Sequence, residues 1–128
     1  MSTASASIDP PLAAVTAAAA SFAALESKLG YLDAADIEQV RLAYRFADTA
    51  HLGQLRHSGE PYITHPIAVA AQVAEWKLDA PAIMAALLHD TMEDCGVTKA
   101  DLVEHFGAPV AELVDGLTKL AKLRFNTR

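Results

Sequence analysis

The spacing of apolar residues predicts a series of helices separated by short polar breaks. Residues 12 to 29 are apolar and rich in alanine, and Gly30 is the expected stop for a helix over this range. A second helix is predicted to begin after Asp33 or Asp36 and to run to about Leu52, because its apolar residues recur at near-helical intervals.

The pattern breaks over residues 53–64, "GQLRHSGEPYIT", which contain two glycines and one proline and show no period. We expect a loop of about a dozen residues, and loops of that length inside compact domains are often functional. A helix is predicted to resume at Pro66. The residue before a proline is disfavoured in the helical region, so His65 is expected just outside this helix, with its ring facing a cleft.

The rest of the sequence predicts three further helices. None of the apolar runs reaches the roughly 18 residues that a membrane span needs. These helices are expected to run from Asp79 or Ala80 through "AIMAALLHDTMED" to about Cys95, from Thr98 through Phe106, and from about Pro109 onward.

Composition supports one all-α domain. The chain has 128 residues, of which 52% are hydrophobic, so it can bury a single modest core. Much of that fraction is alanine, which favours helices over strands. Residues 1–11 are mainly Ser, Thr, Ala and Pro and are predicted to form a disordered tail, so the folded part is expected to be residues 12–128.

The formal net charge of −6 argues against a nucleic-acid-binding or membrane-binding protein, since both partners favour a basic surface. A small anionic ligand stays possible, because local charge decides its binding. Cys95 is the only cysteine, so no intrachain disulfide can form. The alanine-rich start has no basic residue before it, unlike a signal peptide. We therefore expect a soluble cytoplasmic protein.

The stretch "LLHDTMED" places an imidazole and three carboxylates directly after an apolar segment. On a continuous helix His89 and Glu93 would share one face, and Asp90 and Asp94 the neighbouring face. Imidazole and carboxylate suit Mn²⁺, Fe²⁺ or Zn²⁺, and a cation would compensate carboxylates that are buried. The alternative is an exposed polar helix end, and spacing alone leaves both interpretations open.

Three ordered segments, "HLGQLRHSGEPYITHPIAVA", "ALLHDTMEDCGVT" and "FGAPVAELVDGLTKLAKL", resemble the N-terminal hydrolase domain of the Rel/SpoT family. Enzymes of that family make and degrade guanosine tetraphosphate and pentaphosphate, (p)ppGpp. The resemblance covers residues 34 to 123. It implies an all-helical HD-domain fold that binds Mn²⁺.

The resemblance also implies roles for individual residues. His65, His89 and Asp90 match the family's metal ligands, and Glu93 and Asp94 match the acidic pair that activates water and carries catalysis.

The loop between the predicted helices matches the family's nucleotide pocket. Arg56 matches an arginine that packs on the guanine base, which suits a planar guanidinium. His57 stands where the family usually has lysine, so phosphate attraction there would depend on pH. Ser58, Glu60 and Tyr62 would line the same pocket.

The activity implied is hydrolysis of (p)ppGpp at the ribose 3′ position, giving GDP or GTP and pyrophosphate through a metal-activated water. The family's fourth metal ligand lies in a later motif, beyond Arg128 here. The chain is therefore expected to be the first part of an HD hydrolase domain, incomplete at its C-terminus. Synthetase and regulatory domains would follow it in a longer enzyme. The intact acidic motifs resemble the SpoT-like or bifunctional branch.

Two other functions stay open on sequence alone. One is a non-catalytic helical fragment that binds a nucleotide or a partner protein, and the other is an HD phosphohydrolase acting on a different nucleotide. The "RHSGEPY" loop argues against the latter, because generic HD enzymes lack it.

Three residues are expected to serve structure. His51 is expected to pack or cap at a helix end, Cys95 to fill space as a small residue, and Trp76 to pack against the core.

Overall fold

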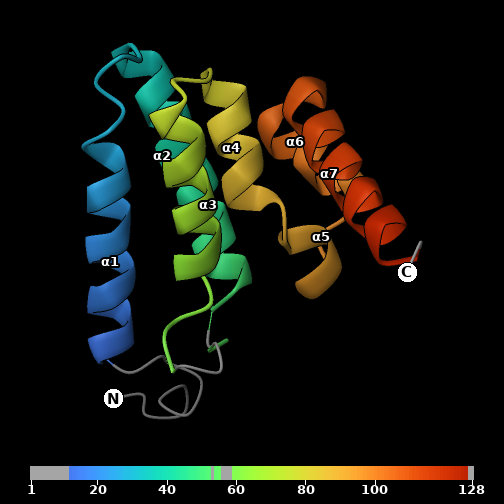
Figure 1. The fold of residues 1–128 in the computed structure, drawn as a ribbon, viewed down its shortest axis with the longest axis horizontal. Coiled ribbons are helices and arrows are strands. Elements are labelled where there is room, and N and C mark those ends of the chain that lie inside the picture. The colour runs from blue at the N-terminus through green and yellow to red at the C-terminus, as the bar shows by residue number, and fades with distance from the viewer. Residues whose placement is uncertain (1–11, 53, 56–58, 127–128) are drawn as a thin grey trace.

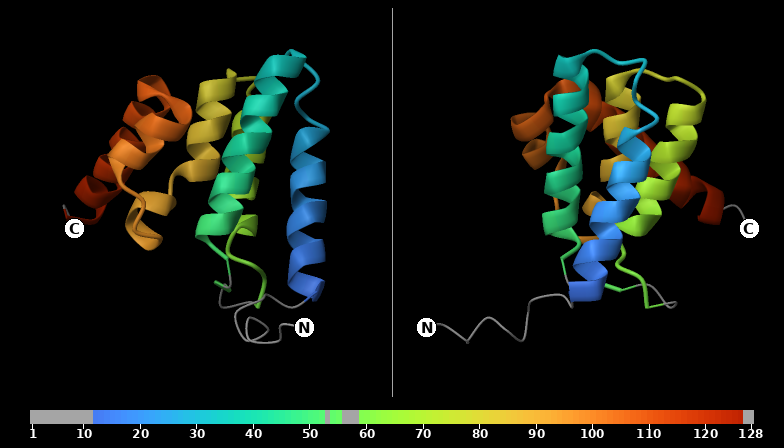
Figure 2. Two further views of the ribbon diagram at one scale, coloured as in Figure 1. Left: turned by 180° about the vertical axis from the view of Figure 1, so that it is seen from behind. Right: turned by 90° about the vertical axis from the view of Figure 1, so that its left-hand side faces the viewer.

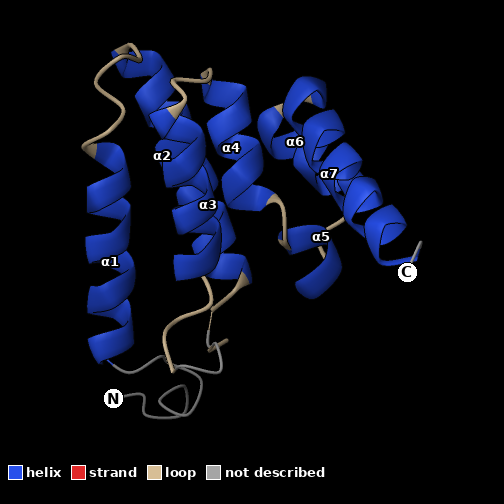
Figure 3. Ribbon diagram, viewed as in Figure 1, coloured by secondary structure: helices blue, strands red, loops and turns tan. Residues whose placement is uncertain are grey.

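The computed structural model describes residues 12–52, 54–55 and 59–126. These residues form α-helices and contain no strand (Figure 3), although one isolated antiparallel bridge joins Leu55 to Pro61. The predicted all-α fold is therefore confirmed, while the predicted tail over residues 1–11 lies outside the described residues. The helices are α1 (Leu12–Glu26), α2 (Ala34–Ala50), α3 (Thr64–Glu75), α4 (Ala80–Leu88), α5 (Thr91–Asp94), α6 (Lys99–Phe106) and α7 (Ala108–Asn126).

The first four helices alternate in direction and pack as a bundle (Figures 1 and 2). Helix α1 packs against α3, α2 packs against α4, and α3 lies antiparallel beside α4. Helices α6 and α7 form a pair that is joined to the bundle through contacts between α7 and α4. The short α5 connects the two parts and contacts α7.

Helix α4 lies at the centre of the packing. Seven of its nine residues are buried, and it contacts α2, α3 and α7. A helix that is apolar on every side needs neighbours all round, which this arrangement provides. Each fully buried leucine or isoleucine contributes about 1.5–3 kcal/mol relative to an exposed one. The burial of α4 fixes the position of whatever follows Leu88.

The predicted starts of three helices are confirmed by their caps. The carboxylate of Asp33 accepts a hydrogen bond from the backbone N–H three residues on, at 2.8 Å, and that of Asp79 does the same at 3.2 Å. Thr98 and Asp101 form a reciprocal capping box. Caps of this kind are each worth about 1 kcal/mol.

Helix α1 ends three residues earlier than predicted. After Glu26 the chain tightens into turns, with the N–H of Leu29 donating to the carbonyl of Glu26 and that of Leu32 to the carbonyl of Leu29. Leu29 is thereby fully buried in the core. The free energy gained by burying Leu29 outweighs what a further helical turn toward Gly30 would contribute.

Helix α3 begins two residues earlier than predicted, so His65 lies in its first turn and not outside it. The hydroxyl of Thr64 donates to the carbonyl of Pro61 at 2.7 Å, and the backbone N–H of His65 donates to the carbonyl of Tyr62 at 3.0 Å. These bonds close a turn before Pro66 and override the usual bias of the residue preceding a proline.

The predicted helix through "AIMAALLHDTMED" is interrupted at His89 and Asp90, which form a turn between α4 and α5. The hydroxyl of Thr91, which is fully buried, donates to the carbonyl of Leu88 at 2.8 Å. Threonine side chains compete in this way with the helical backbone for its last carbonyls. The expectation of two continuous side-chain stripes was therefore wrong.

Trp76 ends α3 with 64% of its surface exposed, so the prediction that it packs against the core was also wrong. None of the helices in the described part of the chain combines the length and the apolar character that crossing a bilayer requires.

Candidate functional site

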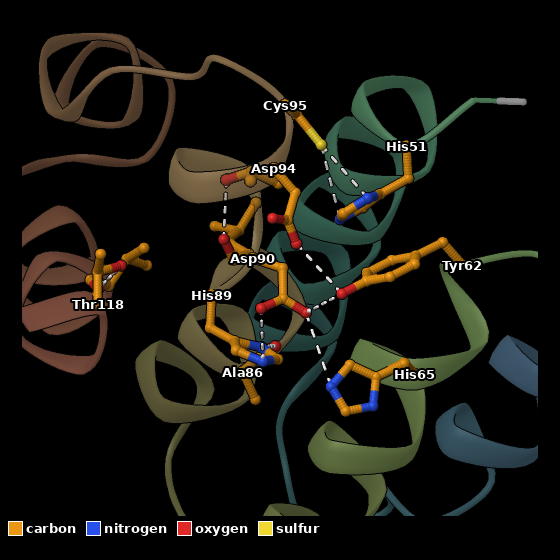
Figure 4. Close-up of polar contacts among 12 residues, drawn as sticks. His51, Tyr62, His65, Ala86, His89, Asp90, Asp94, Cys95 and Thr118 are labelled. Atoms are coloured by element: carbon orange, nitrogen blue, oxygen red, sulfur yellow. Dashed lines mark hydrogen bonds and ion pairs between the residues drawn. The ribbon is translucent and has the colours of Figure 1, made fainter. Parts of the chain in front are cut away.

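Three metal-capable side chains meet where the start of α3 lies beside the α4–α5 turn (Figure 4). The Nε2 atom of His89 lies 3.2 Å from Oδ1 of Asp90, and Nε2 of His65 lies 3.6 Å from Oδ2 of the same carboxylate. The two imidazole centroids are 5.6 Å apart. One ligand atom from each residue falls within 4.8 Å of the others, which is close enough for all three to share one ion.

The hydrogen bond at the other nitrogen of His89 fixes which atom of that ring can bind a cation. Nδ1 lies 2.6 Å from the carbonyl oxygen of Ala86. A carbonyl oxygen only accepts, so Nδ1 carries a proton, and Nε2 is the ring atom left to bind a cation. Metal-binding histidines commonly use this same arrangement to fix their orientation.

Nε2 of His89 lies 3.2 Å from an oxygen of Asp90. Two electron-rich atoms at that distance attract only if a second proton or a cation lies between them. The donor set of two imidazoles and one carboxylate fits a divalent cation of the Mn²⁺, Fe²⁺ or Zn²⁺ type. The residues present therefore fit a divalent-metal site. Because all three of these ions accept imidazole and carboxylate ligands, the donor set does not distinguish among them.

The acidic pair on α5 lies next to this cluster. Oδ2 of Asp94 is 3.1 Å from the hydroxyl of Tyr62, which is also 3.4 Å from Oδ2 of Asp90 (Figure 4). Asp94 and Glu93 are both exposed, whereas the three clustered residues are partly buried. The turn at His89 and Asp90 thus brings Asp94 close to the cluster without a continuous helix.

Tyr62 is held in its neutral form at this position. Burial, followed by the negative charges of Asp90 and Asp94 and the hydrogen bonds to them, raises the pKa of its phenol from its ordinary value to about 12. A neutral phenol has one proton to donate, and both nearby carboxylates can accept it. The sequence placed Tyr62 in a nucleotide pocket but gave no signal for this contact, because it joins residues 28 and 32 positions apart.

The other predicted pocket residues are Arg56, His57, Ser58 and Glu60. Arg56, His57 and Ser58 lie outside the described residues. Glu60 is described, with an exposed side chain in the loop before α3.

The ring of His51 packs against the ring of Tyr62. Its ring is 2% exposed and stacks on the Tyr62 ring, with centroids 4.8 Å apart. Its Nδ1 lies 3.2 Å from Oε1 of Gln54 and 3.3 Å from Sγ of Cys95. The prediction that His51 packs at a helix end is confirmed. Burial raises the pKa of the Cys95 thiol, which suits a structural residue.

A groove of about 580 Å³ lies elsewhere, between α2 and α6. It is lined by apolar residues such as Leu42, Phe46 and Phe106, and by Arg45 and His105. It shares no residue with the His–Asp cluster, so the two are separate features.

Comparison with known proteins gives consistent matches. The sequence profile of the HD domain family matches residues 43–128. This chain is 58% identical to the guanosine-3′,5′-bis(diphosphate) 3′-pyrophosphohydrolase of Vibrio cholerae over 98 residues, which are 77% of the chain. Over the same share it is 54% identical to the bifunctional (p)ppGpp synthase/hydrolase SpoT of Escherichia coli. A GTP pyrophosphokinase of Myxococcus xanthus is 51% identical over 68% of this chain.

The chain spans 12–14% of the length of these relatives. The matches bear out the sequence resemblance to Rel/SpoT proteins over the region that contains all three clustered residues. A profile match that extends over most of the chain, together with an all-helical fold that gathers the His-Asp pair and a second histidine, shows that this protein belongs to the HD domain family.

Proposed function

We propose that this chain is part of a metal-dependent hydrolase that removes pyrophosphate from the 3′ position of (p)ppGpp. The observation that carries the proposal is the meeting of His65, His89 and Asp90 around one point, with Asp94 beside them. The substrate is taken from the names of the relatives, which are 47–61% identical over the matched region.

In this proposal His65, His89 and Asp90 would hold Mn²⁺. When bound, the ion supplies positive charge that favours ionisation of water and offsets charge on the substrate's diphosphate. Asp94 and Glu93 orient the attacking water and accept its proton. The exposure of both carboxylates leaves them open to solvent and substrate.

The guanine nucleotide is proposed to bind along the loop that precedes α3. In this proposal Arg56 packs on the base, His57 attracts the phosphates in a pH-dependent way, and Ser58, Glu60 and Tyr62 belong to the loop that lines the pocket. The position of Tyr62 over the cluster supports this direction of approach, because it connects the loop directly to Asp90 and Asp94.

We also propose that residues 12–128 form the first part of the HD hydrolase domain and that the protein works in the cytoplasm. A single cysteine and the absence of a membrane-spanning helix among the described residues agree with that location.

The test is hydrolysis of labelled ppGpp with Mn²⁺, followed by separation of the products. In the complete enzyme, Asp94→Asn should leave Mn²⁺ content near normal and reduce turnover by about 100-fold or more, because it removes the proposed proton acceptor and leaves the three ligands unchanged. Glu104→Gln, which neutralises an exposed carboxylate on α6, is the matched control and should change neither. Near-normal turnover of Asp94→Asn would refute the assigned role.

Metal content separates the alternatives. His89→Ala should abolish Mn²⁺ binding in elemental analysis of the purified protein. Mn²⁺ binding with hydrolysis of another nucleotide but not ppGpp would favour a different HD phosphohydrolase. Nucleotide binding without any hydrolysis would favour the non-catalytic fragment.

A further inference from the structure

Tyr62 contacts two carboxylates that have different roles in the proposed function. Its hydroxyl lies 3.1 Å from Oδ2 of Asp94, at the end of α5, and 3.4 Å from Oδ2 of Asp90, in the α4–α5 turn (Figure 4). Asp90 is one of the three clustered residues, and Asp94 is outside the cluster. One phenolic proton therefore connects the candidate ligand to the candidate proton acceptor.

The Tyr62 ring has little freedom to move. Its backbone N–H donates to the carbonyl of Gln54 at 2.9 Å, which ties the two sides of the loop together. The buried ring of His51 stacks against it with an interplanar angle of 24°. His51 in turn lies against Cys95, the residue directly after Asp94. The hydroxyl is thus held between the end of α2 and the end of α5.

The hydroxyl of Tyr62 offsets the repulsion between the carboxylates of Asp90 and Asp94. The carboxylates of Asp90 and Asp94 both direct an oxygen at the same hydroxyl, and two negative charges that are close together repel each other. A hydrogen bond donated to a carboxylate stabilises its negative charge, which lowers the repulsion between the two carboxylates. The same bond restricts rotation of the carboxylate that accepts it. The hydroxyl of Tyr62 is a hydrogen-bond partner that these two carboxylates share.

We propose that Tyr62 is a positioning residue, whose hydroxyl sets the orientation of Asp90 toward the cation and of Asp94 toward the water. This inference rests on the proposed function for the role of Asp94. It differs from the role implied by family resemblance, in which Tyr62 lines the nucleotide pocket, because the proton of the hydroxyl is directed at carboxylates of the protein.

The experiment compares Tyr62→Phe with Tyr31→Phe. The hydroxyl of Tyr31 donates to the carbonyl of Leu78 at 2.7 Å, away from the cluster, so this control removes the same atom from a hydrogen bond elsewhere. Mn²⁺ affinity is measured by titration with the spin resonance signal of free Mn²⁺. Hydrolysis of ppGpp is measured with Mn²⁺ saturating for each variant, so that kcat and KM are separated from metal loss.

Removing an outer partner of a metal ligand typically costs about 10–100-fold in affinity or activity. Tyr62→Phe should therefore weaken Mn²⁺ binding by about tenfold and lower kcat by about tenfold or more, with KM within about threefold of the unmodified protein. Tyr31→Phe should match the unmodified protein in all three. Unchanged Mn²⁺ affinity, or an effect confined to KM, would overturn the inference.

The two hypotheses fail in different ways. If the unmodified protein binds Mn²⁺ but does not cleave ppGpp, the proposed function fails, and the Mn²⁺ affinity of Tyr62→Phe still decides whether the hydroxyl positions Asp90.

Discussion

Replacing Leu87 by alanine is expected to destabilise the protein strongly, because Leu87 is fully buried in the central helix α4. Deleting a buried leucine side chain costs about 2–5 kcal/mol, as the transfer energy and the remaining cavity both contribute. A central value of about 3 kcal/mol is a large part of the total stability of a typical domain.

The expected shift in melting temperature follows from the size of the chain. An unfolding entropy of about 2.1 cal/mol/K per residue gives about 0.27 kcal/mol/K for 128 residues. A loss of about 3 kcal/mol therefore lowers Tm by about 11 °C. Thermal unfolding followed by circular dichroism measures this shift, and urea unfolding measures the free energy directly.

Leu113→Ala provides the matched control. Leu113 lies on α7 with 45% of its surface exposed, so the same deletion should cost less than about 1 kcal/mol. Equal losses for Leu87→Ala and Leu113→Ala would contradict the placement of α4 at the centre of the core.

Three further results are expected. Thr98→Ala should cost about 1 kcal/mol in urea unfolding and Thr98→Ser almost nothing, because serine can restore the capping box; equal losses would refute this cap. Burial raises the pKa of Asp48 above 3.8, against a smaller lowering by His51, so its ionised form destabilises the folded state. Asp48→Asn should therefore be at least as stable at neutral pH, with the advantage shrinking toward pH 3.8, and a constant difference across that range would contradict it. Mn²⁺ at 100 times its Kd should raise the unfolding free energy by about 2.7 kcal/mol, and His89→Ala should lose this gain; stabilisation retained by that variant would place the ion elsewhere.

Features that depend on neighbouring residues were predictable from the sequence. Asp33, Asp79 and Thr98 each begin a helix through a bond to the backbone three residues on, so the signal is local. The meeting of His65 with His89 was also predicted, although from family resemblance and not from spacing.

Features that depend on tertiary packing were not predictable. The interruption before Thr91 arises because a buried hydroxyl takes the carbonyl of Leu88, which has no signature in hydrophobic spacing. The early end of α1 likewise follows from burial of Leu29. The bridge from Tyr62 to Asp94 needs the loop and α5 to be brought together by the fold.

The antiparallel pairing of α3 and α4 has a consequence for how the sequence can change. His65 opens one arm of this hairpin and His89 follows the other, so both histidines lie at its open end, opposite the connection over residues 76–79. Added residues in that connection leave the open end in place. A single residue inserted within either arm would shift one imidazole by about 1.5 Å and turn it by about 100° relative to the other. Insertions are therefore tolerable at the closed end, while the lengths of the arms are tied to each other.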